Sequence, residues 1–246
     1  MSLKGKLALV LGATGVIGSG AAYQFLKEGA TVVVVSRTQD KVQELVNELS
    51  KDHGKERIHG VVGSYESKKS VEELYAKAKT ALKGASPDHV VSSIGFAAVT
   101  PTGIIDADVG VLKEAFDESL YSAILAAQVI LADIRDKEGA TYTIVSGGLA
   151  HKAFWPGAWP ATIKNAAVNA LVLSLAADTA DKKVRVNCNC LHFSVGKPGN
   201  ATNQIGMPLV QTSNEFGKTF LGFIAKQDLK GEIVCMGSKE EAEKFY

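Results

Sequence analysis

Short runs of β-branched and other apolar residues alternate along this chain with longer stretches that have helical spacing. The runs expected to form strands are Lys6–Leu11, Thr31–Val35, Ile58–Gly63, His89–Ser93, Thr141–Ser146, Val184–Cys190 and Glu232–Met236. The stretches expected to form helices are Gly15–Glu28, Gln39–Ser50, Ser70–Leu82, Val109–Arg135, Ala161–Ala180 and Asn214–Lys226. This alternation predicts an α/β fold of the Rossmann type, in which a doubly wound parallel sheet of seven strands has helices on both faces.

No repeat, low-complexity tract or linker divides the 246 residues, so we expect one domain over residues 1–246. Lysine and arginine number 27 against 26 acidic residues, a net charge of +1, and this balance favours neither a nucleic-acid partner nor an acidic membrane surface. The most apolar segments, Ile124–Ala132 and Ala166–Ala177, are shorter than the roughly 20 residues of a membrane span. We therefore expect no membrane partner.

The three cysteines, Cys188, Cys190 and Cys235, include no C-x-x-C pair, and no basic and apolar leader precedes Leu7. A reducing cytoplasm is the compartment that this cysteine usage favours. We expect no disulfide framework and no metal site.

A glycine-rich sequence, Gly-Ala-Thr-Gly-Val-Ile-Gly, lies at the point where the first strand gives way to the first helix. Glycines at such a turn let backbone amides and the helix N-terminus approach a pyrophosphate. The alternative is a tight turn that needs glycine only for packing. We favour a dinucleotide site, with these expected contacts: Gly12, Thr14, Gly15, Val16, Ile17 and Gly18.

Ser36 and Arg37 follow the second strand directly. A carboxylate at this place would accept hydrogen bonds from a ribose 2′-hydroxyl, whereas a guanidinium suits a 2′-phosphate. Arg37 therefore favours NADP(H) over NAD(H), unless it is only a solvated side chain at a strand end.

With these residues in view, the whole chain resembles the short-chain dehydrogenase/reductase family. Ser92-Ser93-Ile94-Gly95 stands where that family usually has Asn-Asn-Ala-Gly beside the adenosine ribose, and Lys164 resembles the family's active-site lysine, which binds the nicotinamide ribose. The G-x-x-G-x-x-G spacing is closer to the extended or atypical branches. The resemblance adds these expected cofactor contacts: Ser92, Ile94, Gly95, Lys164 and Ser194.

The resemblance also shows what has changed. The family's catalytic tyrosine falls on Pro160, its serine on Gly147 with Ser146 beside it, and its asparagine on Ser119. Lys164 alone of the four catalytic positions is retained. Loss of a positioned general acid costs on the order of 10²- to 10⁴-fold in rate, so ordinary carbonyl reduction is poorly supported.

Three interpretations follow from this loss. In the first, another group supplies the proton: Ser146 and His192 are the candidates that we retain beside Lys164, although His192 would serve equally as a packed loop residue. His151 is a further candidate, whereas Tyr121 is expected to be buried.

In the second interpretation the acceptor is an imine or iminium carbon, which takes hydride without a proton on its heteroatom. Aromatic ring faces stabilise such a cation by roughly 0.5 to 2 kcal/mol. Fungal short-chain-dehydrogenase-like proteins that reduce imines or template cyclisations have a similar pattern. The expected substrate pocket, lined by aromatic side chains that could also simply cover the cofactor, comprises Phe96, Phe154, Trp155 and Trp159.

In the third interpretation the protein binds NADP(H) as a sensor or scaffold without turnover.

Two helices have unusually apolar faces, one with Ala123, Ala126, Ala127 and Ile130 and the other with Ala166, Ala170 and Leu173. Because the corresponding helices pair between subunits in the family, we expect a homodimer or homotetramer. The alternative is that both helices pack on their own sheet.

Overall fold

The computed structural model describes all 246 residues and contains a seven-stranded parallel sheet in the order β3-β2-β1-β4-β5-β6-β9. The strands are β1 (Leu7–Leu11), β2 (Thr31–Ser36), β3 (Ile58–Val62), β4 (His89–Ser92), β5 (Thr141–Gly147), β6 (Arg185–Leu191) and β9 (Ile233–Met236). The strand order reverses between β1 and β4, where crevices open at the carboxyl ends of the strands. The predicted fold class and all seven strands are confirmed.

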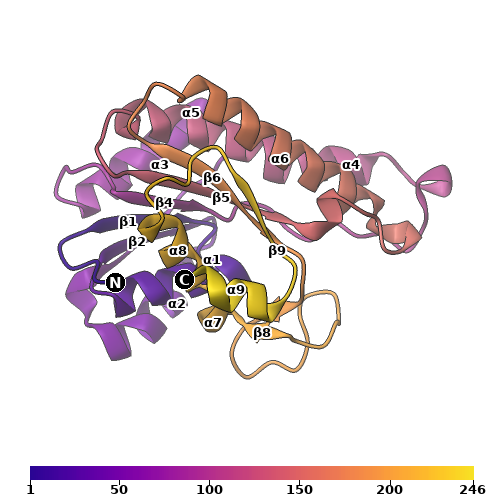
Figure 1. Ribbon diagram of the computed structural model, residues 1–246, viewed down its shortest axis with the longest axis horizontal. Coiled ribbons are helices and arrows are strands. Elements are labelled where there is room, and N and C mark those ends of the chain that lie inside the picture. The colour runs from indigo at the N-terminus through magenta and orange to yellow at the C-terminus, as the bar shows by residue number, and fades with distance from the viewer.

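Helices cover both faces of this sheet, as Figure 1 shows. One face carries α3 (Lys68–Ala81), α5 (Ser122–Ile134) and α6 (Trp159–Asp178), and the other carries α1 (Val16–Lys27), α2 (Gln39–His53), α7 (Ser213–Phe216) and α8 (Thr219–Ala225). Alternate strand residues divide between the two cores: Leu9 and Val33 face the first layer, and Val10 and Val34 the second. This alternation is the two-residue period of a strand that is buried on both faces.

The long helix predicted over 109–135 consists of three segments: α4 (Gly110–Ala115), the π-helical turn η3 (Phe116–Tyr121) and α5. The Ser122 hydroxyl donates to the Asp117 carbonyl at 2.9 Å across this wider turn. A π turn carries one residue more than an α turn, and such turns are frequent at functional sites.

The helix predicted over 214–226 is also divided. Its first part, α7, ends at Phe216 and is followed by Gly217, where a Cβ atom would overlap the backbone of Gly20 in α1. Two short elements were missed, the parallel pair β7 (Val195–Gly196) and β8 (Gln211–Thr212). Two-residue strands carry too little periodicity to be predicted from sequence.

The helix Gly110–Ile134 is long and apolar enough to pass a membrane-span test of length and hydropathy, with a mean hydropathy of 1.3 over its most apolar window. The expectation that no segment reaches this length is therefore wrong on that measure. In the fold, 44% of the window is buried, and Ala126, Ala127 and Ile130 belong to the core against the sheet.

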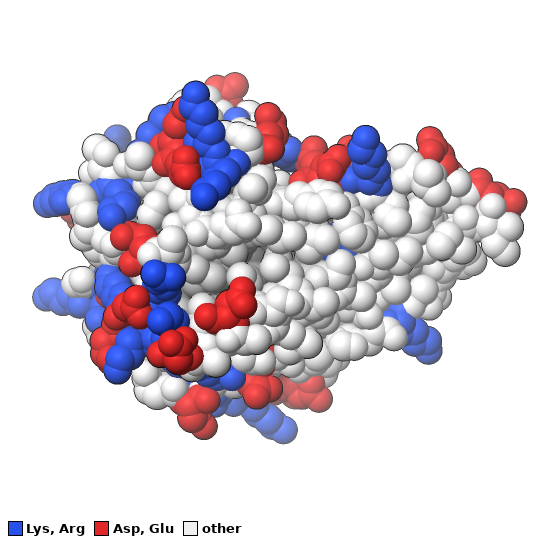
Figure 2. Space-filling view, turned by 90° about the horizontal axis from the view of Figure 1, so that it is seen from above, with Lys and Arg blue, Asp and Glu red and all other residues white.

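The two apolar helix faces have different surroundings. On α5 the expected interface residues Ala123, Ala126, Ala127 and Ile130 are buried within the chain, so the prediction that they face a second subunit is wrong for this helix. On α6 the expected residues Ala166, Ala170 and Leu173 are exposed. Figure 2, seen from above the α5 and α6 layer, shows most charged side chains at one end and others along the margins, with a broad central surface that has few charges.

Candidate active site

Three adjoining cavities lie along the carboxyl edge of the sheet, and we name each after one lining residue. The Arg37 cavity measures about 690 Å³, the Lys164 cavity about 250 Å³ and the Trp155 cavity about 670 Å³. The first two share Gly15, Ser93, Ile94 and Gly95, and the last two share residues that include Gly147, Asn165 and Leu191. The three therefore form one continuous cleft.

The glycine turn of Gly12 to Gly18 is shaped by close backbone contacts. Gly12 has a φ of +69°, and a Cβ atom there would overlap the carbonyl of Ser93. A Cβ atom on Gly18 would lie 2.5 Å from the Gly12 carbonyl oxygen. Only glycine satisfies both positions, because the chain must return on itself while β1 and β4 stay close.

The same turn presents the start of α1 to the cleft. No side chain caps this helix at Gly15, so the first backbone amides keep their donor capacity. Gly12, Thr14 and Gly15 line the Arg37 cavity, whereas Val16 and Ile17 line the Lys164 cavity. This cradle, which a Cβ atom would fill, fits the pyrophosphate of a dinucleotide.

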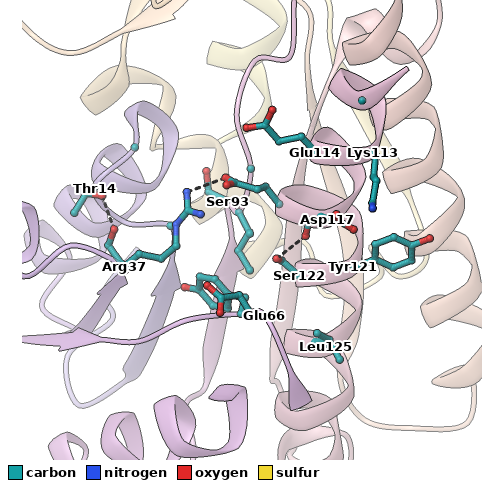
Figure 3. A pocket seen from close by; sticks show the side chains of 18 residues that line it. Thr14, Arg37, Glu66, Ser93, Lys113, Glu114, Asp117, Tyr121, Ser122 and Leu125 are labelled. Atoms are coloured by element: carbon teal, nitrogen blue, oxygen red, sulfur yellow. Dashed lines mark hydrogen bonds and ion pairs between the residues drawn. The ribbon is translucent and has the colours of Figure 1, made fainter. Parts of the chain in front are cut away.

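Arg37 extends from the end of β2 across its cavity toward η3 (Figure 3). Its Nη2 atom lies 2.9 Å from Oε2 of Glu118, and this partner raises the pKa of the guanidinium. On the same side Ser36 Oγ lies 2.8 Å from Thr14 Oγ1. Arg37 is thus at the predicted place, but a carboxylate already occupies part of its donor set.

The lining of the Arg37 cavity includes residues that the sequence analysis missed. They come from the segment after β3 and from the helix around η3, and the carboxyl-edge rule for ligand sites is the signal that could have found the first group. These missed residues are Tyr65, Glu66, Lys113, Glu114, Asp117, Glu118, Ser122 and Leu125.

Tyr121 is 53% exposed, so the prediction that it is buried is wrong. Figure 3 shows its ring directed away from Arg37. The residue that is buried is Ser119, whose side chain is beneath Gly95: a Cβ atom on Gly95 would overlap the Ser119 hydroxyl. Tyr121 thus lines the Arg37 cavity, whereas Ser119 lies on the buried side of the helix.

Of the expected ribose contacts after β4, Ile94 and Gly95 line the cleft together with Ser93. Ser92 is only 2% exposed and lines none of the three cavities, so the structure does not support it as a contact.

Lys164 of α6 is the one titratable side chain in the lining of the Lys164 cavity. Its Nζ atom donates to the Phe96 carbonyl at 3.2 Å, and burial lowers the pKa of the ammonium to about 8. Ser146 lines the same cavity, and its hydroxyl donates to the Asn165 carbonyl at 3.3 Å. The structure thus brings Lys164, Ser146 and Phe96 together, and adds Asn165, which sequence reasoning missed.

The three substituted positions have different surroundings. Gly147 lines the Lys164 and Trp155 cavities. Pro160 is buried in the first turn of α6, where proline is well tolerated, and it lines none of the three cavities. Neither Pro160 nor buried Ser119 presents a side chain to the cleft.

The Trp155 cavity contains no Asp, Glu, Lys or Arg in its lining. Phe154 and Trp155 line it, as expected, and so do Ser194 and Met207, with the Ser194 hydroxyl 3.4 Å from the Met207 carbonyl oxygen. Trp159 is only 6% exposed and lines none of the three cavities, so its assignment to the pocket is wrong. The helix begins at Trp159, and this turn directs the side chain into the protein.

His192 lines the Trp155 cavity but not the Lys164 cavity. Its Nε2 atom lies 3.5 Å from Cys190 Sγ, and burial together with His151 lowers the pKa of the imidazole. His192 and Ser146 are thus in adjoining cavities, and only Ser146 shares a cavity with Lys164.

Comparisons with known proteins agree with this architecture. The family model described as Enoyl-(Acyl carrier protein) reductase matches residues 12–193. The chain is 30% identical over 188 residues to "Dehydrogenase/reductase SDR family member 4" of Sus scrofa, a match that covers 76% of this chain and 64% of that protein. The chain therefore spans slightly less than two thirds of this relative.

Solved structures share the fold at lower identity. A short-chain oxidoreductase from Pseudomonas aeruginosa PAO1, described as NADPH-bound and as containing an atypical catalytic center, has a TM-score of 0.83 and 18% identity, covering 97% of this chain and 98% of that one. An oxidoreductase from Haemophilus influenza with bound NAD has a TM-score of 0.82 and 17% identity, covering 98% and 96%. The same fold thus accepts NADPH in one neighbour and NAD in another. From the family match and the fold, this chain belongs to the short-chain dehydrogenase/reductase family.

Proposed function

We propose that the protein is an NADP(H)-dependent oxidoreductase that reduces an apolar or aromatic small molecule. The observation that carries this proposal is the continuous cleft, in which Arg37, the glycine turn and Lys164 follow one another toward a cavity without Asp, Glu, Lys or Arg in its lining. A reduced nicotinamide bound in this cleft would supply a hydride.

Arg37 and the glycine turn are the residues that would hold the adenosine end. The guanidinium offers further N–H donors besides the one that faces Glu118, and these suit a 2′-phosphate. Glu118 competes with that phosphate for Arg37, so the preference for NADP(H) depends on whether the ion pair between Arg37 and Glu118 opens when the cofactor binds.

Lys164 would act at the other end. A buried ammonium without an acidic partner, whose pKa is lowered to about 8, binds ribose hydroxyls as a donor and holds a transferable proton near neutral pH. Because Pro160 offers no hydroxyl, we assign to Lys164 the protonation of a neutral acceptor such as a ketone. We assign to Ser146, which lines the same cavity, a hydrogen bond to the acceptor atom in place of the one that it donates to the Asn165 carbonyl.

An iminium carbon is the acceptor that needs no such proton. The rings of Phe154 and Trp155 and the absence of charged side chains in the lining of the Trp155 cavity favour a flat, apolar substrate of this kind. The acceptor class can be decided by pH, since only a neutral acceptor depends on protonated Lys164.

The test combines binding and turnover. Titration calorimetry with NADPH and NADH measures cofactor choice, and NADPH fluorescence follows reaction with aryl ketones and with N-methyl iminium salts, whose charge is fixed. We expect NADPH to bind more tightly than NADH and to be consumed with at least one of the two substrate classes. The rate of ketone reduction should fall as the pH rises through about 8, whereas the rate of iminium reduction should not. Bound but inert NADPH would indicate a sensor or scaffold, and no heat with either cofactor would overturn the proposal.

The expectation of a homodimer or homotetramer is kept as a proposal on narrower grounds. The exposed residues Ala166, Ala170 and Leu173 on α6, and the weakly charged surface in Figure 2, support it. Light scattering that gives the mass of one chain would contradict it. A cytoplasmic location likewise stays a proposal, supported by three free cysteines.

A further inference from the structure

Four side chains that bind transition metals meet at one edge of the sheet, outside the Lys164 cavity. Cys190 in β6 and Cys235 in the edge strand β9 are direct neighbours in the strand register. His192 follows Cys190 by two residues, and His151 follows the short helix η4 (Gly148–Ala150). One ligand atom from each of the four lies within 4.8 Å of all the others.

The distances within this cluster match a tetrahedral metal site. The Sγ to Nε2 distances are 3.5 Å for Cys190 and His192, 3.6 Å for Cys235 and His151, and 3.9 Å for Cys190 and His151. Zinc bonds of about 2.3 Å to sulfur and about 2.05 Å to nitrogen, at a tetrahedral angle, place those atoms about 3.6 Å apart. Small side-chain rotations would bring all four ligands to one centre.

Hydrogen bonding alone explains the cluster less well. Nε2 of His151 faces both sulfur atoms, and a single ring nitrogen cannot make a full hydrogen bond to each thiol. The structure gives neither imidazole another side-chain partner, and the rings of His151 and His192 lie with centroids 5.4 Å apart. The four ligand atoms nevertheless lie within 4.8 Å of one another.

We propose that His151, Cys190, His192 and Cys235 form a binding site for one Zn²⁺ ion. Two thiolates and two neutral imidazoles are a donor set that zinc takes in closed, four-coordinate structural sites, whereas Ca²⁺ and Mg²⁺ require oxygen ligands. Two thiolates also balance the charge of a divalent ion. Three of the four residues are exposed, so the ion can enter from solvent.

The bound ion would join parts of the chain that are distant in sequence. It would hold the edge strand β9 to β6 and to the segment after β5, which contributes Gly148 and Leu149 to the Trp155 cavity. His192 lines that cavity, and as a zinc ligand it would be fixed there and could not act as a proton donor. This inference is independent of the cofactor and of turnover.

The test uses the full chain without a polyhistidine tag, stripped of metal and kept under a reductant. Zn²⁺ is titrated against a chromogenic chelator, and Co²⁺ is added separately as a spectroscopic probe. We expect one equivalent of zinc, a higher unfolding temperature with zinc, and the strong visible absorption of tetrahedral cobalt bound to thiolates.

Variants Cys235→Ser and His151→Asn, both at exposed positions, should each weaken zinc binding at least about 100-fold, since each removes one of four ligands. Their matched controls are Cys188→Ala and His59→Asn. The Cys188 thiol donates to Asn169 Oδ1 at 3.6 Å, away from the cluster, and His59 is on β3. Both control variants should still bind one equivalent of zinc. Circular dichroism verifies that each variant is folded.

Three outcomes would overturn the proposal: no binding at micromolar zinc, equal binding by the ligand variants and the parent, or a Cys190–Cys235 disulfide that persists under the reductant. The cobalt spectrum of the parent chain decides the matter even if a ligand variant fails to fold.

Discussion

The two ends of the cleft are built in different ways. At the Arg37 end the decisive feature is backbone: Gly12 and Gly18 keep the turn free of side chains, and α1 presents its uncapped amides. At the Trp155 end the decisive features are side chains on connecting segments, such as Phe154 and Met207, which are 62% and 46% exposed. A site formed by the backbone needs glycine at only a few positions, so it can persist while other residues change. A site formed by side chains on connecting segments can be changed one residue at a time.

Replacing Lys164 by methionine should have the largest effect on turnover. We expect turnover to fall by about 10²- to 10⁴-fold, because the ammonium is the one titratable group in its cavity. The fold should become more stable at pH 7. Burial lowers the folded-state pKa from 10.5 to about 8, so the unfolded chain binds more protons between these values and the buried charge costs on the order of 3 kcal/mol below pH 8.

Denaturant unfolding at pH 7 and pH 10 measures this effect. In the parent chain the free energy of unfolding should rise as the pH increases from 8 toward 10.5, and the Lys164→Met variant should lose that rise. A variant that is less stable than the parent at pH 7 would show that the ammonium is better solvated than its burial indicates.

Gly15→Asp tests the other end with a carboxylate at the start of α1. The backbone there has a φ of −72°, which any residue adopts, and aspartate is a favourable cap, but its Cβ would lie 3.2 Å from the Gly12 carbonyl oxygen. These effects oppose each other, so stability should change by less than about 1 kcal/mol. Cofactor affinity should fall by at least about 100-fold, because the charge occupies the pyrophosphate site. Gly15→Ala is the matched control: it adds the same Cβ atom to the cradle without the charge, so its loss of affinity by calorimetry should be clearly smaller than that of Gly15→Asp.

Arg37→Asp should affect the affinities for the two cofactors differently. Removal of a charge-assisted contact should weaken NADPH by about 10- to 100-fold and leave NADH nearly unchanged. The cavity lining already contains Glu66, Glu114, Asp117 and Glu118, which adds repulsion. Equal losses for both cofactors, measured by fluorescence titration, would contradict the assignment of the 2′-phosphate.

Glu118→Gln should have a smaller and opposite effect. It frees the guanidinium from an ion pair whose side chains are 58% and 35% exposed, and such pairs contribute about 0.2 to 1 kcal/mol. NADPH should bind about 2- to 5-fold more tightly in low salt, with NADH unchanged. If the gain persists undiminished in high salt, the ion pair is not its source.

Pro160→Tyr should restore almost no ketone reductase activity. The position is buried and lines none of the three cavities, so a phenol has no path to an acceptor and should cost about 1 to 3 kcal/mol in overpacking. Ketone reduction by the variant should match the parent. A gain of tenfold or more in the NADPH assay would show that the family's proton donor fits here after all.

The sequence allowed the sheet, the glycine turn and Lys164 to be predicted for physical reasons. Val10 and Val34 lie in a two-residue period, and glycine spacing constrains the backbone locally. Trp159, Tyr121 and Glu118 could not be placed, because a shift of one residue along a helix turns a side chain by about 100° and decides whether it faces the core or the cleft. The same holds for Cys190 and Cys235, since their proximity depends on the β6–β9 register and on no local pattern.

The π turn at Phe116–Tyr121 contains Glu118, the residue that faces Arg37. Because a π turn takes up one extra residue within about one turn, deleting one residue from it would restore regular α winding and leave α4 and α5 nearly in their present phase. Lys113 and Glu114 would keep their places at the mouth of the cleft, whereas the residues inside the turn, Glu118 among them, would shift relative to Arg37. The charge distribution at the adenosine end therefore depends on the length of this turn, as well as on which residues occupy it.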